Sequence, residues 1–371
     1  TFGSLLAPTY VSPRSVQMNL GFQKQIKRGT ILSVYYVRNV GTHFLLGVDT
    51  NQVGDSRNLN VGAAQAAIAA TTQSYNCGGG YSDAAVQCAI AGGATIINFA
   101  KNGLDSANAY CGGFPCALFG LPNAAFGGIN PNVGANEMFF PVGRSLYTGI
   151  QTSLRSDVQS PFRGATHMNL QISYAFSKFQ NNVPTAGSTI QGDQDFLTAA
   201  RDYRSPNRFF GPAGQDRKHQ LSFGAIIDLV KDFQLSGIGH IDSPLPLTLF
   251  LPQEFQGGDI FISDVTGDGT VGDIVPGSNV GSFGRNVSPS GLNHFVSNYL
   301  TTSGGHVTPA GQALVNAGVM TQQDLVSLGA TTPVSCSVGQ QGLLSNGIPC
   351  INTPPGSNAG LGWLKSIDLR L

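Results

Sequence analysis

The sequence predicts an all-β protein built on an antiparallel sheet of about seven long strands, of the kind that forms part of a membrane-spanning barrel. Three observations carry this prediction. Apolar and polar residues alternate along several stretches of the chain. Charged residues make up only 11% of the sequence, whereas roughly 25% is usual in a soluble domain. Short connections between the expected strands alternate with long ones.

The clearest element is a hairpin over residues 144–179, with a turn at 157–164. In its second arm every second residue is apolar, as a strand with one apolar face requires. Each arm has about 12 residues, more than the ~5–6 of a typical strand and enough for the ~9–11 that cross a bilayer at a tilt. We expect one face of the second arm to contact lipid and the other to line a lumen; the first comprises Met168, Leu170, Ile172, Tyr174 and Phe176, and the second Asn169, Gln171 and Ser173.

The same alternation predicts five further strands, at residues 15–27, 31–40, 216–230, 233–242 and 363–371. The connections at 27–30, 157–164 and 231–232 are short, whereas those at 41–142, 180–215 and 243–361 are long. Outer-membrane-type barrels show this alternation, because short turns lie at one rim and long extracellular loops at the other. Helical patterns inside the long loops predict short helices at 61–72, 82–91, 94–104, 308–318 and 321–328.

A seven-stranded sheet has two edges, and bacterial barrels have an even number of strands, at least about eight. We therefore expect the edge strands at 15–27 and 363–371 to pair with other chains or with further barrel strands. Residues 1–371 are expected to form one partial barrel, either a piece of a longer chain or a subunit.

The composition excludes several classes of protein. The 20 basic and 20 acidic residues cancel, which gives no electrostatic reason to bind nucleic acid. No run of 18 apolar residues is present, so no membrane-spanning helix is expected. The chain begins at Thr1 without a signal peptide, as expected of a processed or excerpted piece. Hydrolase sequence patterns are absent and the six histidines are scattered, so an enzyme is not expected.

The six cysteines fall in the long loops as three close pairs. Fifteen pairings are possible, but loop closure favours the nearest partners. A zinc site is the alternative, yet only Cys111 and Cys116 approach the required spacing and no matching pair of histidines accompanies them. We predict disulfides in an oxidising compartment, joining Cys77 to Cys88, Cys111 to Cys116, and Cys336 to Cys350.

One segment resembles a calcium-binding loop. Oxygen-bearing side chains alternate in Asp264, Thr266 and Asp268, a glycine follows, and Asp273 comes next. Val275 stands where an EF-hand has its bidentate glutamate. The alternatives are a calcium loop and an acidic turn at the surface. The acidic and basic residues of 193–204 also have two interpretations. They could bind a ligand or be ordinary loop charges exposed to solvent, and we favour the second interpretation.

Eight segments follow one another in the order of a known family, among them PRSVQMNLGFQKQIKRGTILSVYYVRNVGTH, GRSLYTGIQTSLR, DVTGDGTVGDIVPG and WLKSIDLRL; they are Pro13–His43, Asn130–Gly134, Gly143–Arg155, Ser173–Phe179, Gly192–Phe196, Asp216–Leu229, Asp264–Gly277 and Trp363–Leu371. In these segments the chain resembles the β-barrel region of TonB-dependent receptors, specifically the Oar-like group common in acidobacteria.

The resemblance implies an outer-membrane barrel of about 22 strands around a plug. It also implies extracellular loops that capture a ligand, and uptake energised through the TonB complex. The chain departs from the family in lacking a plug, a TonB box and a terminal aromatic residue, so we expect transport to belong to a parent protein. The alternative is a structural or adhesive surface protein that assembles with other chains. No cofactor is required, and Ca²⁺ is the only ion that the sequence suggests.

Overall fold

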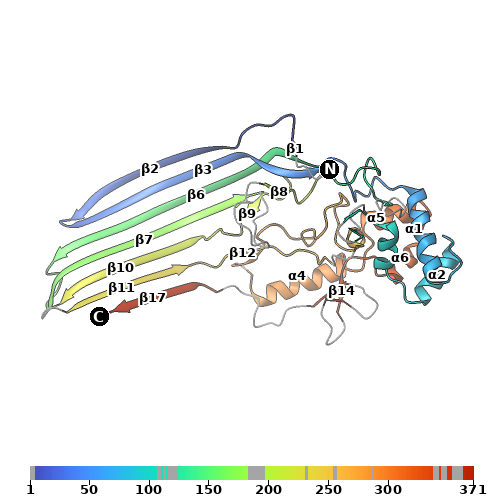
Figure 1. Cartoon of the computed structure of the whole chain (residues 1–371). Coiled ribbons are helices and arrows are strands. Elements are labelled where there is room, and N and C mark those ends of the chain that lie inside the picture. Colours follow the sequence, from blue (N-terminus) through green and yellow to red (C-terminus); the bar gives the residue numbers. More distant parts are fainter. Residues whose placement is uncertain are drawn as a thin grey trace.

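The chain forms an elongated molecule with a long sheet at one end and a domain of loops and helices at the other (Figure 1). The computed structural model describes residues 5–106, 110–111, 114–115, 124–182, 197–229, 233–253, 257–285, 287–336, 342–343, 349–352 and 362–371. Within these residues, no helix is both long and apolar enough to cross a membrane.

Seven long strands form the sheet, and each is antiparallel to its neighbours. They are β2 (Arg14–Lys27), β3 (Thr30–Asp49), β6 (Glu137–Gln159), β7 (Ala165–Asn181), β10 (His219–Leu229), β11 (Gln234–Asp242) and β17 (Leu364–Arg370). Their spatial order is the chain order from β2 to β17, so the sheet is a simple meander. The predicted antiparallel sheet of about seven long strands is confirmed.

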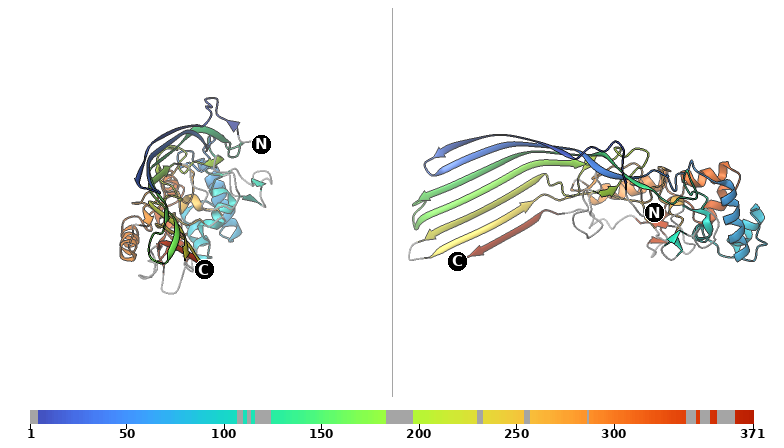
Figure 2. Two further views of the ribbon diagram at one scale, coloured as in Figure 1. Left: turned by 90° about the vertical axis from the view of Figure 1, so that its left-hand side faces the viewer. Right: turned by 45° about the horizontal axis from the view of Figure 1, so that its top comes forward.

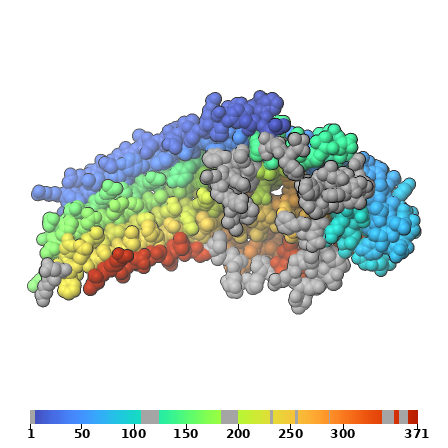
Figure 3. Space-filling model, in the orientation of Figure 1, coloured from blue at the N-terminus to red at the C-terminus, as the bar shows by residue number. Residues whose placement is uncertain are grey.

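The sheet is curved, as the view along the strands shows (Figure 2). In the space-filling view its strands form adjacent diagonal bands (Figure 3). Two tight turns lie at the end remote from the loop domain. In the β2–β3 turn Gly29 has a φ of 77°, and a Cβ on this glycine would lie 2.0 Å from the carbonyl oxygen of Asp157. The turn therefore requires glycine on both counts. The predicted turn at 231–232 lies outside the described residues.

The register gives the sheet two chemically different faces. Apolar side chains of all seven strands share one face, which we call the apolar face; they include Val16, Met18, Leu20, Phe22, Leu32, Val34, Tyr36, Leu146, Ile150, Leu154, Met168, Leu170, Ile172, Tyr174, Phe176, Leu221, Phe223, Ile227, Ile241, Ile367 and Leu369. The opposite, polar face includes Gln23, Ser33, Gln151, Ser153, Asn169, Gln171, Ser173, Gln220, Ser222, His240, Ser366 and Asp368. The predicted alternation along 168–176 is confirmed.

The strands next to the first long connection are longer than the sequence predicts. The connection was expected at 41–142, but β3 continues to Asp49 and β6 begins at Glu137. The pairing of these two strands passes through two irregularities around Phe44, and His43 adopts a φ of 63° there. Alternation fails in this extension because the loop domain covers it, so that Leu46 is fully buried. The other two long connections also differ slightly from 180–215 and 243–361, since β7 ends at Asn181 and β17 begins at Leu364.

The long connections carry the helices. These are α1 (Val61–Ser74), α2 (Asp83–Ala91), α3 (Ile96–Phe99), α4 (Pro289–Thr302), α5 (Pro309–Asn316) and α6 (Gln322–Ser327), with a π-helical turn at Ala100–Leu104 and a 3-10 turn at Asp259–Phe261. The five predicted helical regions are present, although 94–104 is divided between α3 and the π-helical turn. Helix α4 was missed. Ser288 caps its N-terminus with Pro289 following, which is a recognisable start signal.

Short strands complete the loop domain and its junction with the sheet. They are β1 (Leu5–Leu6), β4 (Tyr110–Cys111), β5 (Phe114–Pro115), β8 (Leu197–Ala199), β9 (Gly211–Pro212), β12 (Pro246–Leu247), β13 (Phe283–Gly284), β14 (Val334–Ser335), β15 (Gly342–Leu343) and β16 (Pro349–Ile351).

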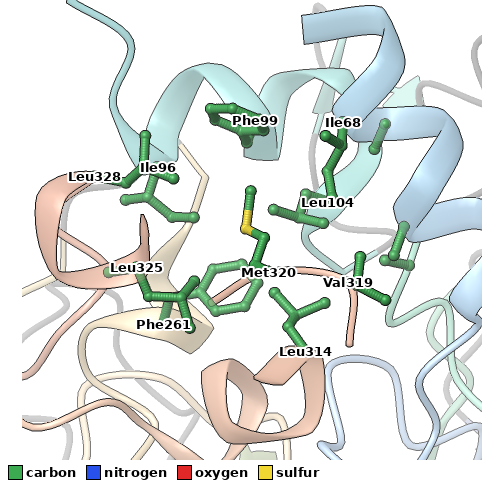
Figure 4. Close-up of a cluster of buried hydrophobic side chains, with 14 of the residues drawn as sticks. Ile68, Ile96, Phe99, Leu104, Phe261, Leu314, Val319, Met320, Leu325 and Leu328 are labelled. Atoms are coloured by element: carbon green, nitrogen blue, oxygen red, sulfur yellow. The ribbon is translucent and has the colours of Figure 1, made fainter. Parts of the chain in front are cut away.

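The first and third long connections share one hydrophobic core. Its members come from residues 64–126 and from residues 260–330. In the close-up, side chains from both regions converge on Met320 (Figure 4). Phe99, Phe261 and Leu325 are fully buried in it. The long loops therefore fold together as one domain.

The two faces of β7 predict opposite responses to a charge. Ile172→Arg places a guanidinium on the apolar face and should destabilise the membrane-inserted protein by ~2–4 kcal/mol, the cost near a bilayer midplane. Ser173→Arg, one residue away on the polar face, is the matched control and should cost far less. Denaturant titration of both variants in lipid vesicles measures the difference. Equal losses would contradict the assignment of the faces.

Candidate functional site

All three long connections meet around the carboxylate of Asp55, which follows β3. Arg204, from the second connection, donates from Nε to Oδ2 at 2.9 Å and from Nη2 to Oδ1 at 2.6 Å. Arg57 donates to the same two oxygens at 3.0 and 2.7 Å. Arg204 also donates to the carbonyl of Gly267 in the third connection. Asp55 is fully buried, and we call this contact the loop junction.

Glycines allow the backbones to approach closely at the loop junction. Asp55 pairs with Asp268 in an isolated antiparallel bridge. Gly269 beside it has a φ of 92°, and a Cβ there would lie 2.3 Å from the carbonyl oxygen of Val53. Only glycine fits this position.

The predicted calcium loop lies against this junction and is compact. Asp264, Asp268 and Asp273 are buried, with 0–3% of each exposed. Asp264 accepts hydrogen bonds from the N–H groups of Gly267 and Gly269 at 2.5 and 2.9 Å. One oxygen of Asp273 accepts from the N–H groups of Val265 and Thr266, both at 2.9 Å.

Asp268 is bonded in the same way. Its Oδ1 accepts from the N–H and the hydroxyl of Thr270 at 2.9 and 2.6 Å, and from the hydroxyl of Thr266 at 3.0 Å. The structure thus brings all four predicted residues together, and most of their carboxylate oxygens accept from donors of their own loop. The exception is Oδ2 of Asp268, which accepts from the N–H of Tyr203 in the second connection. Among the described residues, no group of three or more His, Cys, Asp or Glu side chains is arranged to hold a metal ion. The calcium site stays a prediction.

The buried carboxyls have pKa values shifted in opposite directions, depending on their surroundings. Burial raises the pKa of Asp264 well above its ordinary value, and raises that of Asp273 to about 6, with neighbouring carboxylates adding to both shifts. Burial likewise raises the pKa of Asp105 to about 6. At Asp55 the effect of burial is outweighed by hydrogen bonds from Arg57 and Arg204, and the pKa falls to about 2.

Charges in 193–204 behave differently from the solvated loop charges that we favoured. Asp193 and Asp195 lie outside the described residues. Asp202 is 3% exposed and accepts from Arg208 at 3.1 Å, while Arg204 belongs to the loop junction. The prediction was wrong for Asp202, which is buried and bonded to its near neighbours Ser205 and Arg208. Arg204 is an exposed residue, but its guanidinium binds Asp55, which lies far away in sequence. Asp55 itself was missed, and no local pattern around it indicates its role.

Two of the predicted disulfides are present, Cys77–Cys88 and Cys336–Cys350. Cys116 lies outside the described residues, so the third pairing stays a prediction. The histidines do not gather into a site. His219 instead joins an aromatic group on the apolar face, where its Nδ1 lies 2.8 Å from the hydroxyl of Tyr174.

A cavity of about 510 Å³ lies against the polar face of the sheet. Its wall includes Ser153, Ser173, Ser222 and His240. The register continues this row of polar side chains across the sheet, to Ser33 and Gln23 on one side and to Ser366 on the other. Longer side chains, Gln151, Gln171 and Gln220, flank this row and line the cavity as well. The wall thus offers hydroxyl and amide groups with little net charge.

A second cavity, of about 240 Å³, lies in the loop domain and is mostly apolar. Phe295, Val296 and Tyr299 of α4 line one side, and Leu249 and Phe250 are among the residues of the other. Helix α4, which the sequence analysis missed, therefore forms a wall of this cavity. Its spacing of apolar residues, at 292, 295, 296, 299 and 300, could have revealed it.

The raised carboxyl pKa values predict that the loop domain is more stable at pH 4.5 than at pH 7. The carboxyls of Asp105 and Asp273 bind a proton more tightly in the folded than in the unfolded protein. The stability that these protons add is therefore lost as the pH rises from 3.8, the pKa in the unfolded chain, to about 6, the pKa in the folded one. Ionised Asp55 stabilises the fold, and this stability is lost only as the pH falls from 3.8 towards the folded pKa of about 2. Asp55 therefore does not oppose the change between pH 4.5 and pH 7. Thermal unfolding across this range, with Asp105→Asn expected to flatten the curve, provides the measurement. A rise in stability towards pH 7 would contradict it.

The calcium prediction is tested separately by thermal unfolding at pH 7. Ca²⁺ should raise the unfolding temperature because it binds only the folded loop, and Asp268→Asn should abolish the rise. Asp83→Asn, at the start of α2 and away from the loop, is the control and should leave the rise intact. Equal unfolding temperatures with Ca²⁺ and with a chelator would show that the loop does not bind the ion.

Comparison with known proteins agrees with this architecture. The model of the outer membrane beta barrel domain family matches residues 2–249. No curated protein matches the chain. Among solved structures, the outer membrane transporter YddB from Escherichia coli matches with a TM-score of 0.35 and 7% identity, over 67% of this chain. The chain spans 23% of the length of that transporter. With two thirds of its length matched by the family model, the chain belongs to the outer membrane β-barrel domain family, and its location is the outer membrane.

Proposed function

We propose that this chain forms the wall and the extracellular loop domain of an outer-membrane receptor-transporter that is energised through TonB. The observation that carries the proposal is the polar face of the sheet, together with the cavity that lies against it. A membrane barrel needs such a face only where it encloses a lumen or a plug. The uncharged row of serines suits the passage of a polar solute.

The loop domain is the part that meets the ligand in this proposal. Its core, the two disulfides of the described residues and the loop junction hold three separate connections in one arrangement. A preformed arrangement lowers the conformational cost of binding. The apolar cavity beside α4 is a place where such a domain can hold part of a ligand.

Further strands complete the barrel in this proposal. Within the described residues, β2 pairs along its length only with β3, and β17 only with β11. Each edge presents unpaired peptide groups, which cost several kcal/mol apiece in a bilayer. We infer that strands of the same longer polypeptide, or of other chains, cover both edges.

The orientation is tested with cysteine variants of the full-length protein in intact cells. Val326→Cys places an exposed thiol on α6 of the loop domain, and Arg163→Cys places one in the β6–β7 turn. A membrane-impermeant maleimide should label the first variant in intact cells and the second only after the outer membrane is permeabilised. The unsubstituted protein gives the background from the native cysteines. Labelling of the turn alone in intact cells would reverse the orientation.

The dependence on TonB separates a receptor from an adhesive protein. The full-length protein in detergent should bind the purified periplasmic domain of TonB, whereas an adhesive surface protein should not. A barrel of unrelated function purified in the same detergent is the control. Absence of binding, together with correct loop labelling, would favour the structural or adhesive alternative.

A further inference from the structure

The charged residues on the apolar face share one sign. Up to Thr42 of β3 and Arg144 of β6, all charged side chains that the register places on this face are basic; they are Arg14, Lys24, Lys27, Arg38, Arg144, Lys178 and Lys365. The acidic residues of the same strands, Asp157, Asp228, Asp242 and Asp368, lie on the polar face. This segregation is unexpected in a chain whose charges cancel overall.

Five of these basic residues lie on the side nearer the loop domain. On three strands they follow the last apolar residue of this part of the apolar face; these successions are Val16 to Arg14, Leu146 to Arg144, and Phe176 to Lys178. On β17, Lys365 lies between Ile367 and Trp363. Arg38 lies at a similar level on β3, since Arg38 and Lys178 pair with the same residue, Thr148. We call Arg14, Arg38, Arg144, Lys178 and Lys365 the basic rim.

Aromatic side chains mark the same level. Rings of Tyr174, Phe176 and Trp363 surround His219, with centroid separations of 5.2 Å to Phe176 and 6.0 Å to Trp363. Such a group on the lipid side of a barrel is typical of the girdle at the border between hydrocarbon and headgroups. The basic rim therefore lies at the depth of lipid headgroups.

The basic rim has no counter-charge within the described residues. All five side chains belong to exposed residues, and none of them takes part in the ion pairs of the described chain. Arg144 lies over the ring of Phe210, 4.4 Å from its centroid, which leaves the edge of the guanidinium available. Exposed cations next to an apolar surface call for a partner that is both anionic and amphiphilic.

We propose that the basic rim binds the phosphate groups of anionic lipids in the leaflet on the loop side. Arg38 and Lys178 lie on either side of Thr148, two strand spacings or roughly 10 Å apart at the backbone. Their long side chains can reach one phosphate between them, with the Thr148 hydroxyl as a further donor. The acyl chains of the same lipid lie along the apolar face below. This second contact favours a lipid over free phosphate, which gains nothing from an apolar surface.

The test uses the full-length protein in neutral detergent with phosphatidic acid as the probe. Native mass spectrometry should show phosphatidic acid bound in preference to phosphatidylcholine. Because a basic residue near an anionic membrane surface contributes on the order of 1 kcal/mol, each substitution to Gln should weaken binding about fivefold. Arg38→Gln combined with Lys178→Gln is the principal variant. The variant with all five residues changed to Gln should show the larger loss.

The matched control combines Arg155→Gln with Arg370→Gln, which removes the same charge from the polar face. It should bind phosphatidic acid like the unsubstituted protein. Circular dichroism and heat-dependent migration in gels establish that each variant is folded, and the milder Lys178→Gln variant serves if the double variant is not. Equal loss in both double variants, or displacement of the lipid by inorganic phosphate, would overturn the proposal. Neither result depends on TonB binding or on loop labelling, so the two proposals fail separately.

Discussion

The structure depends on one constraint: every peptide group within a bilayer needs a hydrogen-bond partner in the protein. The seven strands of the meander meet this constraint for one another, with continuous registers along adjacent pairs. Because side chains alternate across a strand, the same registers sort the residues into an apolar and a polar face. Glycines in the sheet are covered by aromatic rings of the next strand, Gly21 by Tyr35 and Gly239 by Phe223, which fills the space that the missing side chains leave.

The long connections are stabilised in a different way from the sheet. They lack alternation, and the first and third together bury one hydrophobic core. The loop junction adds a buried ion pair that is satisfied by two arginines. Because both arginines bind the same carboxylate, it stays paired when either one is removed, and loss of both would leave an unpaired buried charge, at a cost of about 3–5 kcal/mol. The junction therefore favours one arrangement of the three connections over any other.

The buried carboxyls show how surroundings rather than residue type set chemical behaviour. Asp55 and Asp273 are both inaccessible, yet the first has a pKa of about 2 and the second about 6. Arginine partners account for the former, and burial near other carboxylates accounts for the latter. Strongly shifted carboxyls gather at functional sites, although structural networks produce them too. In this protein they lie where the loops meet, so the ionisation of the loop domain is linked to its stability.

The sequence by itself determined the sheet. Alternation over 168–176 and over 16–22 depends only on a residue and its neighbours, because the requirement to have one apolar face applies to each strand separately. The hairpins followed from short turns, and two disulfides followed from proximity in sequence. The helical patterns of the loops were visible for the same local reason.

Only the tertiary structure decided how the loops fit together. Arg204 and Asp55 are 149 positions apart, and neither residue carries a local sign of its partner. The extension of β3 to Asp49 depends on cover from the loop domain, which removes the alternation on which a prediction of strands relies. The separation of basic from acidic residues between the two faces likewise became visible only with the register. The face on which a strand residue lies, relative to residues of other strands, is known only when its pairing partners are known.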